Sequence, residues 1–326
     1  MNRTLTSLET TMHHQYGRAH AARVWAVLPL LLMAMLLVST RAFGAETQQK
    51  TFATPDEAVN ALVAAAKAND AKAIRAVLGN DPGDLSSGDA VADRALREQF
   101  VTAYDAKHAL ATAADATKLT IGNDDFPFAF PLVKTGERWH FDTKAGRDEL
   151  LARRIGANEL DAIKVLQAVV DAEREYVTAD RNGNGVIEYA MKFASSSGKR
   201  DGLYWPAKAG DPPSPLGELV VKAAGEGYRA KQGTPTPFHG YYYRMLKGQT
   251  ASATGGAADF VVRGHAIAGF AVIAYPAKYA SSGIMTFMVN QDGVVYQADL
   301  GPATQAKASK MQKFDPGSGW SKVTTP

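Results

Sequence analysis

The fold of this chain is decided by Ile284-Met-Thr-Phe-Met-Val-Asn-Gln-Asp-Gly-Val-Val-Tyr-Gln-Ala-Asp-Leu300. Two runs rich in apolar, aromatic and β-branched residues flank Asp292-Gly293, a dipeptide typical of a tight hairpin turn. Three earlier runs have the same character, namely Tyr241 to Leu246, Phe260 to Arg263 and Ala266 to Tyr275. Successive strands with short connections predict an antiparallel β-meander over residues 240–326.

The first half of the chain is patterned for helices instead. Thr54-Pro55-Asp56-Glu57 places a capping residue, a proline and an acid where a helix begins. Apolar residues at helical spacing predict helices over residues 55–66, 74–78, 91–110 and 159–177, with a shorter helical stretch from 147 that pauses at Gly156. Short strands are predicted at 119–121, 126–133 and 138–142, the middle one interrupted by Pro127 and Pro131. The fold class is therefore α+β, with a helical N-terminal half that holds a few strands and a C-terminal antiparallel meander.

The first 44 residues have the pattern of a cleavable signal peptide. A basic lead with Arg18 and Arg23 precedes an apolar run from Val24 to Val38. A helix of that length spans about 22 Å, which is less than the ~30 Å hydrocarbon core of a bilayer. Ala42-Phe43-Gly44 supplies small residues at the positions that signal peptidase reads. We therefore expect cleavage near Gly44, a periplasmic or secreted location, and no stable membrane span after cleavage.

Composition divides the chain into four regions. Residues 1–44 are the signal peptide, and translation starts at Met1 and at Met12 are both compatible with it. Residues 45–201 form a mainly helical region with a small sheet, and residues 202–239 form a Pro-rich connector with a short helix. Residues 240–326 form the antiparallel β region.

Charge and cysteine content exclude several functions. The signal carries four arginines and one glutamate of the 36 basic and 33 acidic residues, so the remaining chain has 32 of each. A net charge of zero gives no support for nucleic-acid binding. The chain has no cysteine, which excludes disulfides, thiol catalysis and c-type haem attachment.

One loop has the spacing of a metal site. In Asp180-Arg-Asn-Gly-Asn-Gly-Val-Ile-Glu188, the side chains of Asp180, Asn182 and Asn184 alternate, and Gly185 stands at the sharp turn. The Val186 carbonyl and Glu188 complete a candidate calcium ligand set. The twelfth position, where calcium loops carry a bidentate Glu, is Met191, so binding is predicted to be weak. The alternative is a hydrogen-bonded turn without an ion. A short exit helix over Tyr189 to Ala194 is also predicted.

Catalytic motifs are missing from the sequence. There is no HExxH zinc motif, no G-x-S-x-G nucleophile turn and no phosphate-binding loop of the G-x-x-x-x-G-K-[ST] type. A hydrolase acting on an envelope polymer stays open as the rival hypothesis, because folding can bring distant residues together. Asp180 or Glu188 paired with His239 is the combination that this hypothesis would use.

The C-terminal motifs resemble those of one bacterial family. Gly202-Leu-Tyr-Trp-Pro206, Gly240-Tyr-Tyr-Tyr-Arg244 and the run from Gly283 to Tyr296 are similar to the secreted bacterial proteins catalogued as domain of unknown function 2950. The loop Asp180 to Tyr189 and the stretch Phe52 to Glu57 fit the same resemblance. The resemblance implies an exported bacterial protein of one recurring architecture, without an established activity.

Together, these observations favour an exported envelope protein that acts as a non-catalytic structural or interaction module. Calcium is the only cofactor that the sequence suggests, and an unknown envelope protein or polymer is the expected partner. Whether the protein is an enzyme stays open, with the periplasmic hydrolase as the alternative.

Overall fold

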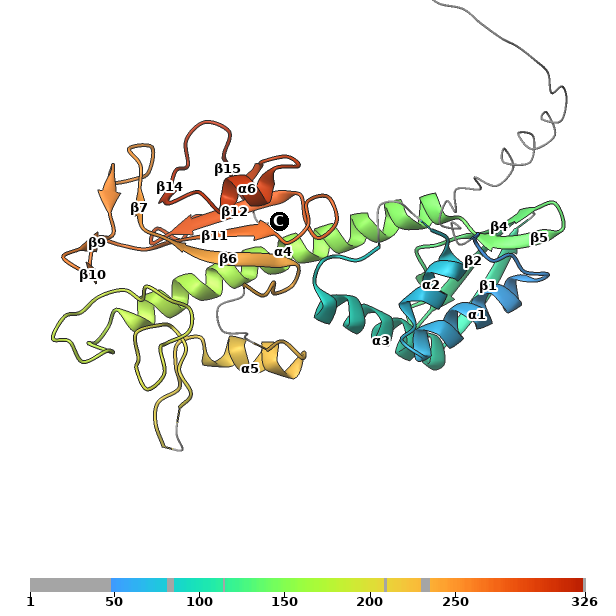
Figure 1. The fold of residues 1–326 in the computed structure, drawn as a ribbon, viewed down its shortest axis with the longest axis horizontal. Helices are drawn as coiled ribbons and strands as arrows, with labels where there is room; N and C mark the ends of the chain where they lie inside the picture. The colour runs from blue at the N-terminus through green and yellow to red at the C-terminus, as the bar shows by residue number, and fades with distance from the viewer. Residues whose placement is uncertain (1–47, 81–84, 114, 208–209, 230–234, 325–326) are drawn as a thin grey trace, which may run out of the picture. The chain divides into compact units, whose positions relative to one another are not determined.

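The computed structural model describes residues 48–80, 85–113, 115–207, 210–229 and 235–324. The chain consists of two compact units, Met1–Ala45 and Glu46–Pro326. The first unit, and with it the predicted signal peptide, lies outside the described residues. The fold below is that of the second unit (Figure 1).

A side chain caps the start of each of the first three helices, and the sequence predicts the first of these caps, Thr54. Thr54 accepts a hydrogen bond from the Glu57 amide at 3.2 Å, and Glu57 accepts one from the Ala53 amide at 3.0 Å. Asp70 and Asp89 cap the next two helices in the same way. The helices are α1 (Pro55–Lys67), α2 (Ala71–Leu78) and α3 (Ala90–Ala106). These caps satisfy amide groups that the first helical turn leaves free.

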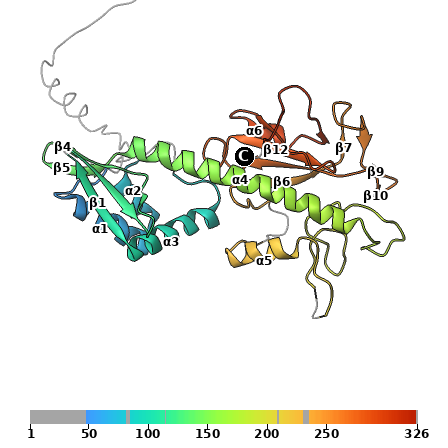
Figure 2. The same ribbon diagram turned by 180° about the vertical axis from the view of Figure 1, so that it is seen from behind.

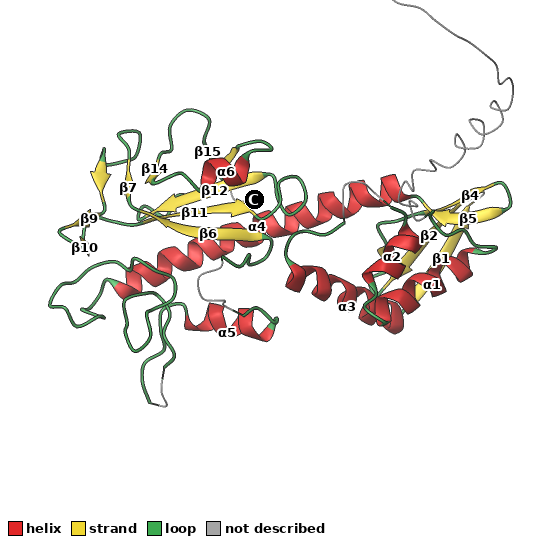
Figure 3. Cartoon of the chain, viewed as in Figure 1, coloured by secondary structure: helices red, strands yellow, loops and turns green. Residues whose placement is uncertain are grey.

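A small antiparallel sheet accompanies these helices. Its strands are β1 (His108–Ala113), β2 (Ala116–Ile121), β3 (Phe126–Pro127), β4 (Leu132–Thr135) and β5 (Arg138–Phe141). The order is β1-β2-β4-β5, and β3 pairs with β2. Apolar side chains of α1 and α2 share a hydrophobic cluster with Leu119, Leu132 and Phe141 of the sheet. The sheet is therefore covered by helices on one face (Figure 3).

One prediction for this region is wrong. The third helix ends at Ala106, not at Leu110, because the following residues pair with β2 as strand β1. The predicted strand over 126–133 is interrupted, as its two prolines predict, and forms β3 and β4, since Pro127 and Pro131 cannot donate to a ladder.

One long helix, α4 (Thr143–Tyr176), joins this part to the C-terminal sheet. The predicted pause at Gly156 is wrong, because the helix runs through it. Glycine inside a helix costs only about 1 kcal/mol, and contacts on both sides outweigh that cost. Arg154 donates to the Leu85 carbonyl at 2.7 Å, and Asn158 donates to the Ser282 carbonyl at 2.8 Å.

The C-terminal meander is confirmed. Its strands are β6 (Tyr241–Leu246), β11 (Ala271–Pro276), β12 (Met285–Asn290), β13 (Tyr296–Asp299) and β15 (Ser321–Lys322). They follow the order β15-β13-β12-β11-β6, with every neighbouring pair antiparallel. Gly293, with φ of 76°, turns the chain between β12 and β13.

Short elements complete this half of the chain. They are helices α5 (Gly217–Gly225) and α6 (Thr304–Ala308), and strands β7 (Gly248–Gln249), β8 (Ala258–Asp259), β9 (Val261–Val262), β10 (His265–Ala266) and β14 (Lys313–Phe314). Strands β14, β7 and β8 form a three-stranded sheet, and β9 and β10 form a separate hairpin. The predicted strand from Ala266 to Tyr275 is therefore split between β10 and β11.

Both faces of the C-terminal sheet are buried. Val272 and Ala274 of β11 pack with α4, while Ile273 and Tyr275 pack on the opposite side with α6 and β14. Figures 1 and 2 both show α4 running along the sheet formed by β6, β11 and β12. Within the described residues, no helix is apolar over a length sufficient to span a bilayer.

Candidate functional site

The loop Asp180–Glu188 follows the end of α4 and is held by its own polar side chains. The Asp180 carboxylate accepts hydrogen bonds from the Gly183 and Gly185 amides, each at 2.8 Å, and from the Asn184 amide at 3.2 Å. Gly183 and Gly185 have φ of 76° and 84°, a conformation that glycine adopts without steric cost. The predicted alternation of Asp180, Asn182 and Asn184 thus gives a compact turn.

Three of the predicted ligands converge on one point. The amide nitrogens of Asn182 and Asn184 lie 2.8 and 2.5 Å from the same carboxylate oxygen of Glu188, Oε1. An Asn side chain presents either its nitrogen or its oxygen to such a point, depending on a half-turn of its amide. In the structure both side-chain amides donate to the Glu188 carboxylate. The side-chain oxygens of Asn182 and Asn184 accept hydrogen bonds from the backbone amides of Asn184 and Val186, at 3.1 and 2.9 Å.

The second oxygen of Glu188 fastens the loop to the β9–β10 hairpin. Oε2 accepts a hydrogen bond from the Ala266 amide at 3.0 Å and lies 3.3 Å from Nδ1 of His265. The Glu188 side chain is only 8 % exposed. A charge so enclosed needs partners, and here they come from two segments far apart in the sequence.

The hydrogen bonds keep both acids of the loop ionised. The hydrogen bond from the Gly185 amide, together with the other loop amides, holds the pKa of Asp180 below its usual value, despite some desolvation. Partial desolvation is the largest influence on Glu188 and raises its pKa, but the hydrogen bonds from Asn182, Asn184 and Ala266 together outweigh it. The pKa of Glu188 therefore also lies below its usual value.

The loop offers amide oxygens in place of further carboxylates. Within the described residues, no three His, Cys, Asp or Glu side chains gather as metal ligands, since Asp180 and Glu188 are the only acids of the loop. No hydrogen bond in the described part of the chain engages the carbonyl of Val186. The residue types of the loop are those that a hard cation takes as oxygen ligands, but the Asn182 and Asn184 oxygens accept backbone hydrogen bonds in this structure.

The predicted exit helix over Tyr189 to Ala194 is absent. Tyr189 donates its amide to the Ala266 carbonyl at 2.9 Å, and Ala190 donates to the Glu173 carboxylate at 2.9 Å. Farther on, Ala194 forms a bridge with Tyr204. Because these amides bind distant partners, the segment runs extended, and the loop has a helix on one side only.

Glu173 is a site residue that the sequence reading missed. It is fully buried in α4, and its second carboxylate oxygen, Oε1, has no hydrogen-bond partner within the described chain. Burial raises its pKa to about 8. A signal did exist, because Glu173 continues the apolar stripe of Leu166, Val169 and Val170 at helical spacing.

The four histidines of the described chain occupy different environments. His140 is a residue of strand β5, as predicted, and His108 stacks on Tyr104 at 3.8 Å. His239 lies 2.7 Å from a carboxylate oxygen of Glu226 through Nε2, and 3.4 Å from Asp161 through Nδ1. The rival hypothesis pairs His239 with Asp180 or Glu188, but the structure pairs Glu188 with His265.

Both ring nitrogens of His239 therefore face carboxylates. A histidine that acts as a general base needs one nitrogen free for the substrate. His239 also has φ of 49° and stacks on Phe238 at 4.0 Å. In this arrangement it connects Asp161 of α4 with Glu226 at the end of α5.

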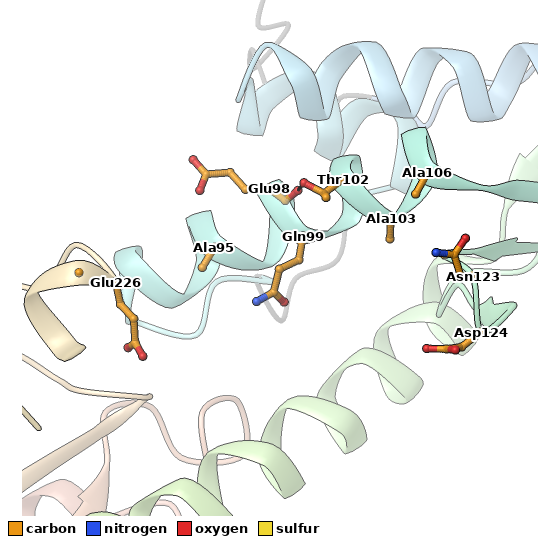
Figure 4. Close-up of a pocket in the computed structure, with 11 residues that line it drawn as sticks. Ala95, Glu98, Gln99, Thr102, Ala103, Ala106, Asn123, Asp124 and Glu226 are labelled. Carbon is orange, nitrogen blue, oxygen red and sulfur yellow. Dashed lines mark hydrogen bonds between the residues drawn. The ribbon is translucent and has the colours of Figure 1, made fainter.

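An open hollow of about 610 Å³ lies near this histidine. Figure 4 shows the side chains of Gln99, Asp124 and Glu226 reaching toward it from α3, the turn after β2 and the end of α5. Small residues of α3, including Ala95, form its wall. Glu226 lines the hollow, whereas His239 does not. The Glu226 carboxylate that lines the hollow is already bound to Nε2 of His239 at 2.7 Å.

The hydroxyl of Ser196 lies between a lysine and an aspartate. It accepts from Lys192 at 2.8 Å and donates to Asp201 at 3.0 Å. The hydrogen bond from Lys192 is the main reason that the pKa of Asp201 falls to about 2. Lys192 is an ion-pair partner of Asp201 at 2.7 Å, so it is not a base for Ser196.

The family model described as "Protein of unknown function (DUF2950)" matches residues 49–323. This match covers most of the chain, so the chain belongs to that family, and the resemblance seen in the C-terminal motifs is confirmed. The description names no activity. No curated protein and no solved structure matches the chain.

Proposed function

For a member of this family, we propose an exported, non-catalytic structural or interaction module of the cell envelope, in which the loop Asp180–Glu188 binds calcium weakly. The observation that carries this proposal is the position of Glu188, whose carboxylate contacts both the loop amides and the β9–β10 hairpin. A cation at Oε1 would brace the end of α4 against that hairpin. The partner would be an envelope protein or polymer.

Calcium binding would require a small rearrangement of the loop. Asn182 and Asn184 would turn their amide oxygens toward Glu188 and give up the hydrogen bonds that these oxygens accept from the Asn184 and Val186 amides. The cation would offset the repulsion between the oxygens that it draws together. Oxygens that share a Ca²⁺ ion at roughly 2.3–2.6 Å lie about 3 Å or more apart, whereas the Asn184 amide nitrogen is 2.5 Å from Glu188. The loop would therefore widen slightly. With two carboxylates, a Kd of roughly 10⁻⁴–10⁻³ M is expected.

Thermal unfolding in calcium and in chelator tests the calcium part. Ten times a Kd of about 1 mM stabilises a protein by about 1.4 kcal/mol, which corresponds to a rise in Tm of roughly 2–5 °C for a chain of this size. Glu188→Gln should abolish the rise. Asp171→Asn, at an exposed acid of α4, should leave it intact. An equal Tm in calcium and in chelator would refute calcium binding, and elemental analysis of untreated protein gives an independent readout.

Export is tested separately. The apolar run before Gly44 supports it. Expression in a bacterial host, followed by intact mass measurement, should show loss of the segment that ends near Gly44 and recovery of the protein outside the cytoplasm. A full-length mass with cytoplasmic recovery would refute this part of the proposal.

A hydrolase is the second candidate function, and one observation favours it. Nδ1 of His265 faces the Glu188 carboxylate at 3.3 Å, and the His265 side chain is 35 % exposed. A carboxylate behind an accessible imidazole is the arrangement of a general base that activates water. Release of soluble fragments from purified envelope polymer, lost in His265→Gln and kept in His239→Gln, would support this candidate. No release by the unaltered protein would reject it.

A further inference from the structure

Strand β1 forms an open edge of the N-terminal sheet. It pairs with β2 through residues His108 to Ala113, and no other described segment pairs with its outer side. Five of its six residues are exposed. The strand contains no Lys, Arg, Asp, Glu or Pro. Charge, proline, bulges or a covering segment are the usual means by which natural sheets protect an edge.

Among the described residues, the outer edges of β5, β15 and β6 differ from that of β1. Beside β5, Phe52 exchanges two backbone hydrogen bonds with Trp139, at 2.8 and 2.9 Å. Strand β15 has only two residues, of which one is Lys322. Strand β6 carries Arg244 and is bridged at its start by Phe238. Of these four edge strands, β1 alone is six residues long with neither a charged residue nor a covering segment.

The two faces of β1 differ in a way that suits extension of the sheet. Leu110 lies opposite Leu119, and Thr112 lies opposite Thr117, both of which are buried residues of β2. Residues that face each other on paired strands share one face of the sheet. His108, Leu110 and Thr112 thus lie on the core face, and the solvent face of β1 consists of alanines 109, 111 and 113.

From this edge we infer that the protein self-associates, with β1 of one copy pairing antiparallel with β1 of a second copy. The twofold axis passes through Leu110, so residue 109 of one copy lies opposite residue 111 of the other. This register keeps the core faces of both copies on the same side, whereas a shift by one residue would place Leu110 against an alanine of the solvent face.

A second copy is the partner that this strand fits. Leu110 beside Leu110 continues the row that begins with Leu119. On the solvent face, Lys118 of β2 lies opposite Ala111 of β1. In the dimer, Ala111 would lie opposite Ala109 of the second copy, and Thr120 of that copy would follow in the same row. No like charges face each other in any row. The interface is one strand wide and lacks a helix contact, so the dimer is expected to be weak.

Single cysteines test the register, because the natural chain has none. Two Cα atoms opposite each other on antiparallel strands are about 4.5–5.5 Å apart, within the range for a disulfide. Leu110→Cys should therefore give a covalent dimer on mild oxidation. In Ala111→Cys, the two thiols lie on diagonal positions about 7–8 Å apart, so at least tenfold less cross-linking is expected. Equal cross-linking of both variants would overturn the register.

Sedimentation of the purified protein tests association itself, over roughly 10 µM to 1 mM. The natural chain should show a rising dimer fraction, and Ala109→Lys with Ala111→Lys should remain monomeric, because the new charges would face each other. Thr135→Lys, at an exposed position of β4 in the same sheet, is the matched control and should dimerise normally. A natural chain that stays monomeric throughout would overturn the proposal. If Leu110→Cys fails to fold, Ala109→Cys with Ala111→Cys leaves the core face intact and should cross-link.

Discussion

The buried carboxyl of Glu173 makes a quantitative prediction about stability. Burial raises its pKa from 4.5 to about 8 in the folded protein, against a smaller opposite effect of the Ala190 amide. The folded state therefore binds this proton more tightly than the unfolded state does. Its contribution to stability is fully present below about pH 4.5 and is lost as the pH rises from 4.5 toward 8.

The size of the loss follows from the two pKa values. Each unit of difference between the folded and the unfolded pKa corresponds to about 1.4 kcal/mol in the free energy of unfolding. At about pH 7.5 the unfolded chain has released the proton and the folded chain still holds it. The free energy of unfolding is then about 4 kcal/mol lower than it is at low pH. Glu173→Gln has no such cost, and its amide oxygen can still accept the Ala190 hydrogen bond. The variant should be more stable than the natural chain by about 3–4 kcal/mol at that pH, and by about 0.4 kcal/mol at about pH 4.5.

Urea unfolding followed by circular dichroism measures both differences. With a slope of about 3 kcal/mol per molar urea, the midpoint at about pH 7.5 should rise by roughly 1 M. Glu175→Gln, an exposed position two residues along α4, is the control and should change little at either pH. An equal effect of Glu173→Gln at both pH values, or a loss of stability at the higher one, would refute the assignment of a protonated, buried carboxyl.

Three further substitutions test the packing. Leu166→Ala, at a fully buried position of α4, should lower the free energy of unfolding by roughly 2–5 kcal/mol, measured by urea denaturation. Asp89→Ala removes a helix cap and takes away the acceptor of the Gly240 amide and of the Tyr228 O–H group. It should therefore cost about 3–5 kcal/mol, against about 1 kcal/mol for the exposed cap Asp70→Ala, by the same assay. Gly202→Ala would place a methyl group 2.8 Å from the backbone at Ala194, so Tm should fall by several degrees.

The parts of the fold that the sequence predicts well are those with local causes. The helix start at Thr54 follows from its own hydroxyl and from Glu57, three residues on. The turn at Gly293 follows from a dipeptide that adopts positive φ readily. The burial of β12 follows from its run of apolar residues.

The wrong predictions concern segments whose structure depends on distant partners. Residues 108–113 are rich in alanine and continue a helical pattern, yet they form a strand because Leu110 packs beside Leu119. Residues 189–194 also look helical, but their amides bind Ala266 and Glu173. Gly156 looks like a helix end, and only the contacts of Asn158 and its neighbours keep α4 continuous. Intrinsic propensity is a weak prior that such contacts override.

The same distinction holds for the candidate site. The spacing of Asp180, Asn182 and Asn184 is local, so the sequence predicts that they share a turn. Glu188 and Ala266 are 78 residues apart in the sequence, and no pattern in either segment predicts their contact. The pairing of Glu188 with His265, in place of His239, could be learned only from the fold.

Glu173 and Glu188 both fix the segment from Glu188 to Ala190, and these contacts limit how much calcium could stabilise that segment. The Glu188 carboxylate accepts a hydrogen bond from the Ala266 amide. The Glu173 carboxylate of α4 accepts one from the amide of Ala190, two residues after Glu188. These hydrogen bonds form without an ion, so the described loop is the ion-free form, and calcium would have to shift it to a rearranged one. A ligand shifts such an equilibrium only by its differential affinity for the two forms. Because the hydrogen bonds from Asn182 and Asn184 to Glu188 must be given up, calcium can add only a small increment to the stability of this segment. A weak site that adjusts the attachment of the β9–β10 hairpin is therefore more consistent with these contacts than a metal that organises the fold.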